Sequence, residues 1–180
     1  MKLLMVFFLI LVAISATVML VRAFRTYLKF RGKRIVSCPG NHLAAAVEVS
    51  AAKAALQSTV DEPSLVLSKC SRWPGRPGCG QACLAQIEEA PKSCLVGTIV
   101  NQWYAGQGCA YCHAPFHKIH WHDHAPALLD ENNLTVEWKD VPPEKLQQTF
   151  RTHLPVCWNC HMAQTFRRLH PELVVTRPPH

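Results

Sequence analysis

Two short stretches, Cys109-Ala110-Tyr111-Cys112-His113 and Cys157-Trp158-Asn159-Cys160-His161, contain the residues on which the fold of this chain depends. Each stretch places two cysteines three positions apart, so that both thiolates of a pair can point toward one centre. Two such pairs, separated by 44 intervening residues, supply the four soft ligands of a tetrahedral metal site. The pattern therefore predicts a metal centre formed by Cys109, Cys112, Cys157 and Cys160.

The segment between the two pairs favours a β-hairpin. Residues 126–129 and 134–138 flank the turn sequence Asp130-Glu131-Asn132-Asn133, with alternate residues from Leu134 onward facing inward. Two CxxC knuckles with a hairpin between them, over about residues 107–162, resemble a zinc ribbon with an inserted helix, although His113 stands where that family usually has glycine. The resemblance implies a structural zinc ion held by the four cysteines.

Both pairs are also followed directly by histidine, and Cys-x-x-Cys-His is the attachment signature of c-type haem. Under this alternative, Cys109, Cys112 and His113 hold one covalent haem c, and Cys157, Cys160 and His161 hold a second. The sixth iron ligands would come from the other histidines of the region: His117, His120, His122, His124, His153 or His170. The sequence leaves both interpretations open, with zinc as the main one.

The other cysteines suggest a second site. The chain has nine cysteines in 180 residues. An odd number cannot all pair in disulfides, and such a count is more typical of metal ligation or redox chemistry in a reducing compartment. A metal bound by four of them would hold the Pro- and Gly-rich stretch 70–80, which is unsuited to regular structure. These four are Cys38, Cys70, Cys79 and Cys83; ordinary core cysteines are the alternative interpretation. Cys94 is left as a small buried apolar residue, so the expected cofactor is one or two zinc ions.

The first 21 residues predict a transmembrane anchor. The run from Leu3 to Val21 has no charged residue and, at about 1.5 Å per residue, just spans a hydrocarbon core about 30 Å thick. A cleavable signal peptide is the competing interpretation, but the apolar run continues past the small residues Ala13–Ser15 near which it would be cut. We therefore expect a single-pass protein of a bacterial-type inner membrane.

Positive charge is concentrated immediately after this run, where six basic residues lie between Arg22 and Arg34. Apart from these and Lys2, the basic residues balance the 12 acidic ones, so the folded part lacks the positive surface that a nucleic-acid binder needs. Short loops rich in Lys and Arg stay in the cytoplasm, which predicts a cytoplasmic domain. The haem alternative requires a domain facing the periplasm, because haem is attached outside the cytoplasm.

The expected organisation is an anchor (1–21), a basic juxtamembrane connector (22–36), a Cys-rich N-terminal subdomain (37–105), a double-knuckle metal-binding subdomain (106–172) and a tail (173–180). The fold class is a small α+β metal-stapled domain behind one transmembrane helix. Strands are expected at 44–49 and 65–67, and helices at 50–58, 80–90, 95–104, 142–152 and 158–170. The five tryptophans, Tyr104 and Phe166 are expected to pack in the core or against the knuckles.

The sequence has no serine-nucleophile motif, no phosphate-binding glycine loop and no HExxH. Four thiolates in two knuckles indicate a closed structural site, so we predict no catalysis and no small-molecule substrate. His120, His122 and His124 would share one face of an extended segment, where they could bind a transition metal. The preferred interpretation is that they form the polar, solvent-exposed edge of a loop.

The predicted function is a membrane-anchored metal-binding module for interaction or assembly with a protein partner. The alternative is a membrane-anchored dihaem cytochrome that transfers electrons on the periplasmic side.

Overall fold

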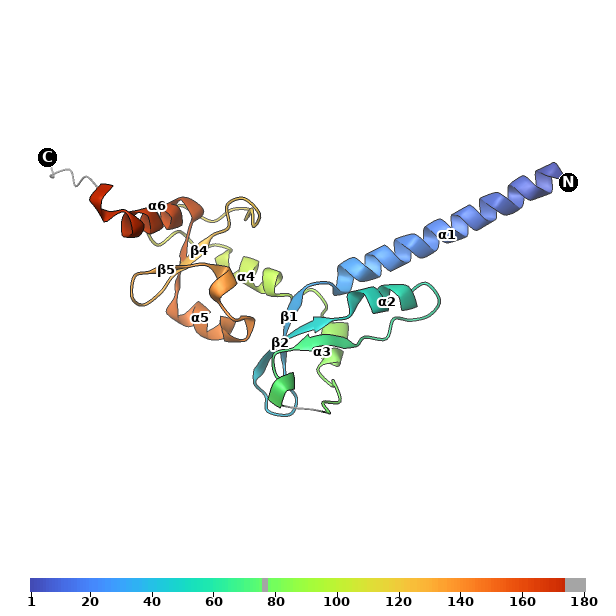
Figure 1. Cartoon of the computed structure of the whole chain (residues 1–180), viewed down its shortest axis with the longest axis horizontal. Helices are drawn as coiled ribbons and strands as arrows, with labels where there is room; N and C mark the ends of the chain where they lie inside the picture. Colours follow the sequence, from blue (N-terminus) through green and yellow to red (C-terminus); the bar gives the residue numbers. More distant parts are fainter. Residues whose placement is uncertain (76–77, 174–180) are drawn as a thin grey trace. The chain divides into compact units, whose positions relative to one another are not determined.

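A computed structural model of the chain describes residues 1–75 and 78–173. The chain divides into two compact units, Met1–Thr98 and Ile99–His180 (Figure 1). Each unit combines helices with one small antiparallel sheet of three strands, which confirms a mixed α and β fold built on small sheets. Residues 174–180 of the expected tail lie outside the described residues, as do Arg76 and Pro77 of the Pro- and Gly-rich stretch.

The first unit opens with α1 (Lys2–Phe30), a single helix of 29 residues. The side chains from Leu3 to Val21 are all exposed, and an 18-residue window of the helix has a mean hydropathy of 2.9. By length and composition, α1 can cross a membrane. The helix continues to Phe30, and β1 begins at Lys33, so most of the segment expected to be a connector has regular structure.

The sheet of the first unit has the order β1-β2-β3, with both pairs antiparallel. Its strands are β1 (Lys33–Ser37), β2 (Ala44–Val49) and β3 (Leu67–Cys70). The β2 strand lies where the sequence predicts it, whereas β3 begins at the last residue of the predicted strand. The accompanying helices are α2 (Ala51–Gln57), the 3₁₀ turn η1 (Trp73–Gly75) and α3 (Leu84–Glu89).

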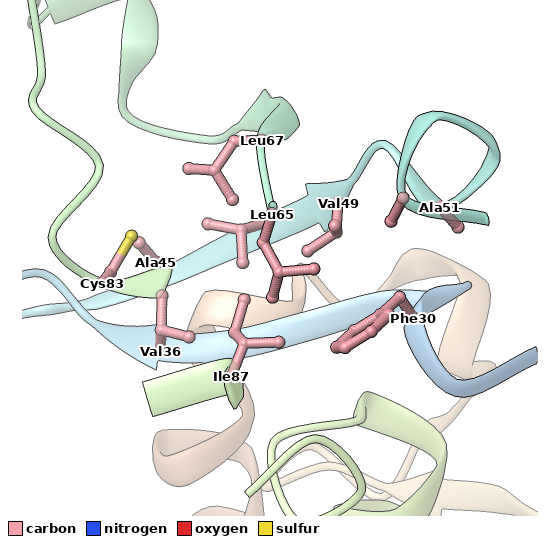
Figure 2. Packing of buried hydrophobic residues seen from close by; sticks show 11 residues of the cluster. Phe30, Val36, Ala45, Val49, Ala51, Leu65, Leu67, Cys83 and Ile87 are labelled. Atoms are coloured by element: carbon pink, nitrogen blue, oxygen red, sulfur yellow. The ribbon is translucent and has the colours of Figure 1, made fainter. Parts of the chain in front are cut away.

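The core of this unit forms on one face of the sheet. Alternate residues of β2 are buried, as the two-residue period of a strand requires. Figure 2 shows side chains from β1, β2 and the segment before β3 converging with Phe30 of α1 and Ile87 of α3. Ile87 is completely buried, and burying a side chain of this size stabilises a fold by about 1.5–3 kcal/mol. Phe30 thus ties the end of α1 to the sheet.

A buried arginine completes that junction. Arg34 of β1 has no exposed surface, and its guanidinium donates hydrogen bonds to the backbone carbonyls of Lys29 (2.7 Å), Phe30 and Gly32 (3.0 Å). The last carbonyls of a helix have no partners within the helix, and a cation there also interacts favourably with the helix dipole. Arg34 therefore caps α1 and fixes the direction in which the chain leaves it.

The second unit has a sheet of order β5-β4-β6, all antiparallel. Its strands are β4 (Ala127–Leu129), β5 (Thr135–Val136) and β6 (Leu154–Val156). Helix α4 (Val96–Tyr104) crosses the boundary between the units, and α5 (Leu146–Thr152), α6 (Trp158–Leu169) and three 3₁₀ turns follow: η2 (Trp138–Asp140), η3 (Pro143–Lys145) and η4 (Pro171–Leu173).

The predicted hairpin is present as β4 and β5. Its turn is held by Asp130, whose carboxylate accepts the backbone N–H groups of Asn132 (2.9 Å) and Leu134 (2.7 Å), an arrangement for which Asp is well suited. The inward orientation expected for Leu134 is wrong, since this residue is 44% exposed. The strand begins only at Thr135, which leaves Leu134 in the turn.

Aromatic side chains fill the interior of the second unit. Tyr104 is completely buried; its hydroxyl donates to the carbonyl of Ala127 (2.7 Å) and accepts from the indole N–H of Trp138 (2.9 Å). Trp103 stacks on Phe150 at a centroid distance of 5.0 Å. These contacts connect α4, α5 and η2 with β4, the strand beside the cysteine pairs. Phe166 was also expected in the core, but it is half exposed on α6, so that expectation is wrong.

Candidate metal centre

The four knuckle cysteines meet at one point in the second unit. The donor sulfurs of Cys109, Cys112, Cys157 and Cys160 all lie within 4.8 Å of one another, and those of Cys112 and Cys157 are 3.8 Å apart. A tetrahedral site with Zn–S bonds of about 2.3 Å has sulfurs about 3.8 Å apart. Among the residues that the structure describes, this is the one group of three or more such side chains placed to hold a metal ion.

The first knuckle is a tight turn closed by backbone hydrogen bonds. His113 N–H donates to the carbonyl of Cys109 (2.9 Å), and Cys109 N–H donates to the carbonyl of Ala114 (2.9 Å). His113 has a φ of 58°, in the left-handed region that glycine adopts most easily. His113 thus adopts the backbone conformation for which zinc ribbons usually have glycine here. Histidine in place of glycine therefore does not disrupt the turn.

The second knuckle is built on a helix start. Cys157 is the N-cap residue of α6, and Cys160 lies in the first turn of that helix. Free backbone N–H groups and the positive end of the helix dipole favour thiolates at this position. The backbone N–H of Cys160 accordingly lowers the pKa of Cys157, although burial raises that pKa overall.

Strand β6 brings the two knuckles together. Ala110 N–H donates to the carbonyl of Pro155 (2.9 Å), and Cys157 N–H donates to the sulfur of Cys109 (3.3 Å). Cys109 is completely buried and packs in one cluster with Ala127 and Val156, which are directly paired across β4 and β6. The centre is thus attached to the sheet on its inner side, while Cys112 is exposed on the outer side.

The environment of the sulfurs differs between the two pairs. Burial alone would raise the pKa of Cys109, but the backbone N–H groups of Cys112, Cys157 and Tyr111 outweigh it and lower that pKa to about 6. Burial raises the pKa of Cys157 and of Cys160, and the sulfurs of Cys109 and Cys112 raise both further. One thiolate is therefore easily formed, and crowding opposes ionisation of the others. A central cation reverses this balance, because it favours all four thiolates at once.

The two histidines of the CxxCH sequences lie in different environments. His113 is exposed on its turn. His161 is 5% exposed on α6, with Nε2 3.9 Å from a carboxylate oxygen of Glu137 and with Nδ1 buried and unpartnered among the described residues. His120, His122 and His124 lie on a turn in which His124 N–H donates to the His120 carbonyl (2.9 Å). The expected extended segment is therefore absent, and the three form an exposed loop rim.

The second set of cysteines lies in the first unit. Cys38, Cys70, Cys79 and Cys83 all line one cavity of about 310 Å³. Burial raises the pKa of Cys83, and the sulfurs of Cys79, Cys70 and Cys38 raise it further, so these side chains are electrostatic neighbours. Cys94 lies outside this cavity; its thiol donates weakly to the carbonyl of Ala90 (3.4 Å) and interacts with Arg34.

Two groups that position these sites are not evident in the sequence. The hydrogen bonds of Tyr104 hold β4, and the guanidinium of Arg34 caps α1. The sequence signal for Arg34 is its two-residue offset from Val36, which puts both on the buried face of β1. Comparison of the chain with protein families, curated proteins and solved structures finds no match.

Proposed function

We propose that this chain is a membrane-anchored protein whose second unit is stapled by one structural zinc ion bound to Cys109, Cys112, Cys157 and Cys160. The convergence of the four sulfurs within 4.8 Å is the observation that carries the proposal. All four donors are thiolates, which are soft ligands that select zinc over magnesium or calcium. Four protein ligands leave no open coordination position, so the site is structural rather than catalytic.

The same spacing weighs against the dihaem alternative. A pair of thioether bonds would fix a separate porphyrin to each knuckle, and each macrocycle is wider than the whole sulfur cluster. The sulfurs of Cys112 and Cys157 belong to different pairs and yet lie 3.8 Å apart. Two haems attached at this separation would occupy the same space.

The anchor is proposed from α1. Nineteen consecutive exposed side chains without a charge, from Leu3 to Val21, form an apolar surface far larger than water-soluble proteins expose, and a lipid bilayer covers such a surface. Arg22 and Arg25 follow at the end of the run, where basic residues favour the cytoplasmic side. We therefore assign the protein to a bacterial-type inner membrane, with the chain after α1 in the cytoplasm and a protein partner for interaction or assembly.

Metal analysis of the full chain in detergent tests the metal centre. We expect the second unit to bind one zinc ion that is lost in Cys112→Ser, with a large fall in that unit's melting temperature, because metal binding supplies folding free energy in small zinc domains. Four of the five tryptophans lie in this unit, so their fluorescence reports its unfolding. Cys94→Ser is the matched control and should keep the metal. If Cys112→Ser retains its zinc and its melting temperature, the proposal is wrong.

The dihaem alternative is tested on protein produced in a host competent in haem attachment. A red protein with haem that resists acid–acetone extraction would replace the zinc proposal with an electron carrier. The anchor is tested separately by alkaline carbonate extraction of membranes. The full chain should stay in the membrane pellet, and a variant that lacks residues 2–21 should be extracted.

A further inference from the structure

Four thiols gather at one end of the sheet in the first unit. Cys38 follows the last residue of β1, and Cys70 is the last residue of β3. Both strands run antiparallel to β2, which lies between them, so their carboxyl ends lie at the same end of the sheet. Cys83 caps the start of α3 at this end, beside Ala45 of β2 (Figure 2). Cys79 reaches it from the loop before α3.

These four side chains surround one cavity. The space measures about 310 Å³ and is lined by Cys38, Cys70, Cys79 and Cys83, together with Val36, Leu67 and Trp73. Its wall is mostly apolar apart from these thiols. Arg72 also lines the cavity, and its buried Nε has no hydrogen-bond partner among the described residues. One buried guanidinium nitrogen without a partner, on a partly exposed arginine beside four thiols, favours negative charge in this space.

We propose that Cys38, Cys70, Cys79 and Cys83 bind a second thiolate-ligated metal centre, independent of the one in the second unit. Four thiolates around one divalent ion carry a net charge of −2, and the guanidinium of Arg72 offsets part of that charge. The centre would also fix Cys70 and Cys79, which flank a stretch whose sequence is rich in Pro and Gly.

Two occupants share this ligand chemistry, a single zinc ion and an iron–sulfur cluster, since both are bound by four cysteine thiolates. In the second unit, four sulfurs meet at the spacing of a single ion. Here the sulfurs surround a space with room for several water-sized groups. The four sulfurs are not grouped at the spacing of a single ion in the part of the chain that the structure describes, which favours the larger occupant, an iron–sulfur cluster.

The test uses the full chain in detergent, purified without oxygen and analysed for zinc, iron and acid-labile sulfide. Metal-free protein is also reloaded, with zinc alone or with ferric iron, sulfide and a thiol reductant. We expect the full chain to bind two metal centres, the one held by the four cysteines of the second unit and an extra one in the first unit. Cys79→Ala should lose that extra centre, and because Cys79 is exposed, the substitution removes no core packing. Zinc in the extra centre identifies the single ion, and equal iron and sulfide identify the cluster.

Two controls separate this inference from the proposed function. Cys94→Ser changes a cysteine of the same unit outside the cavity and should keep both centres. Cys112→Ser should lose only the centre of the second unit, so a metal that remains in this variant belongs to the first unit whatever happens to the other site. The inference is overturned if Cys112→Ser binds no zinc and no iron, or if Cys79→Ala binds as much as the unaltered chain.

Discussion

Replacing His113 by glycine separates the two interpretations of the CxxCH sequence. In the structure, His113 contributes its backbone to the first knuckle: its N–H donates to the Cys109 carbonyl, its φ is 58°, and its side chain is exposed. A shared metal ion needs this backbone conformation and does not use the imidazole. A haem attached to Cys109 and Cys112 needs the imidazole as its iron ligand.

The expected change in stability follows from the backbone angle. A left-handed conformation costs a residue with a Cβ atom about 1–2 kcal/mol, and glycine removes this strain. Glycine also makes the unfolded chain more flexible, which opposes the gain by about 0.4–1 kcal/mol. The net effect of His113→Gly on the zinc-loaded second unit is a stabilisation of about 0.5–1 kcal/mol, or about 2–8 °C in melting temperature for a domain below 100 residues.

The assay is thermal unfolding of the zinc-loaded full chain in detergent, followed by tryptophan fluorescence, with zinc content measured beside it. Asn133→Gly is the matched control: Asn133 has a φ of 61° in the hairpin turn, but it lies outside the knuckles and asparagine tolerates this conformation. It should change the melting temperature by less than His113→Gly does. A clear loss of stability or of bound metal in His113→Gly would refute the reasoning, because it would show that the imidazole itself is needed.

Four further predictions concern the surroundings of the two sites. Tyr104→Phe leaves the Ala127 carbonyl and the Trp138 indole N–H without their partner and should cost about 1–3 kcal/mol; an unchanged fluorescence melting curve would contradict it. Gly108→Ala places a Cβ atom 3.0 Å from the His113 carbonyl oxygen and should lower zinc affinity, measured by competition with a chelator, because the knuckle backbone must shift. Arg34→Met leaves several carbonyls at the end of α1 unpaired and should cost about 3 kcal/mol, seen as faster proteolysis between α1 and β1; equal rates for both proteins would disprove the capping role. In the metal-free protein, the pKa of Cys109 falls from 9.0 to about 6, so between these values the unfolded chain binds more protons and stability should rise with pH; a melting temperature that falls from pH 6 to 8 would show the opposite sign.

Local patterns in the sequence predict much of the secondary structure. The strand at 44–49 and the helices α4 and α6 lie within a residue or two of their expected positions, because the alternation of β2 and the apolar periodicity of the helices are strong signals. The helix expected over 80–90 is shorter, since α3 begins at Leu84. Gln81 has a φ of 55°, and this left-handed residue ends the preceding loop and delays the helix.

Side-chain contacts are less readable from the sequence. The basic residues after the apolar run predict a juxtamembrane connector, yet Arg34 is completely buried because the free carbonyls of α1 provide its partners. All five tryptophans are half-buried rather than buried, and the hydrogen bond from Trp138 to Tyr104 depends on η2 folding back onto α4. This pairing joins residues 34 positions apart, where no periodicity connects them.

The choice between one shared ion and two separate haems is a question of this long-range kind. Each CxxCH sequence is compatible with both, because the spacing within a pair is the same in a knuckle and in a haem-attachment site. What separates the alternatives is the distance between the pairs, and that distance is set by the chain around them. Strand β6 pairs with β4 and ends at Cys157, while Ala110 N–H donates to the carbonyl of Pro155 on the same strand. The first knuckle is thereby held against the strand that leads into the second. Any substitution that breaks this contact without touching a cysteine should therefore lower zinc affinity, because the sulfurs would have to be brought together by the ion alone.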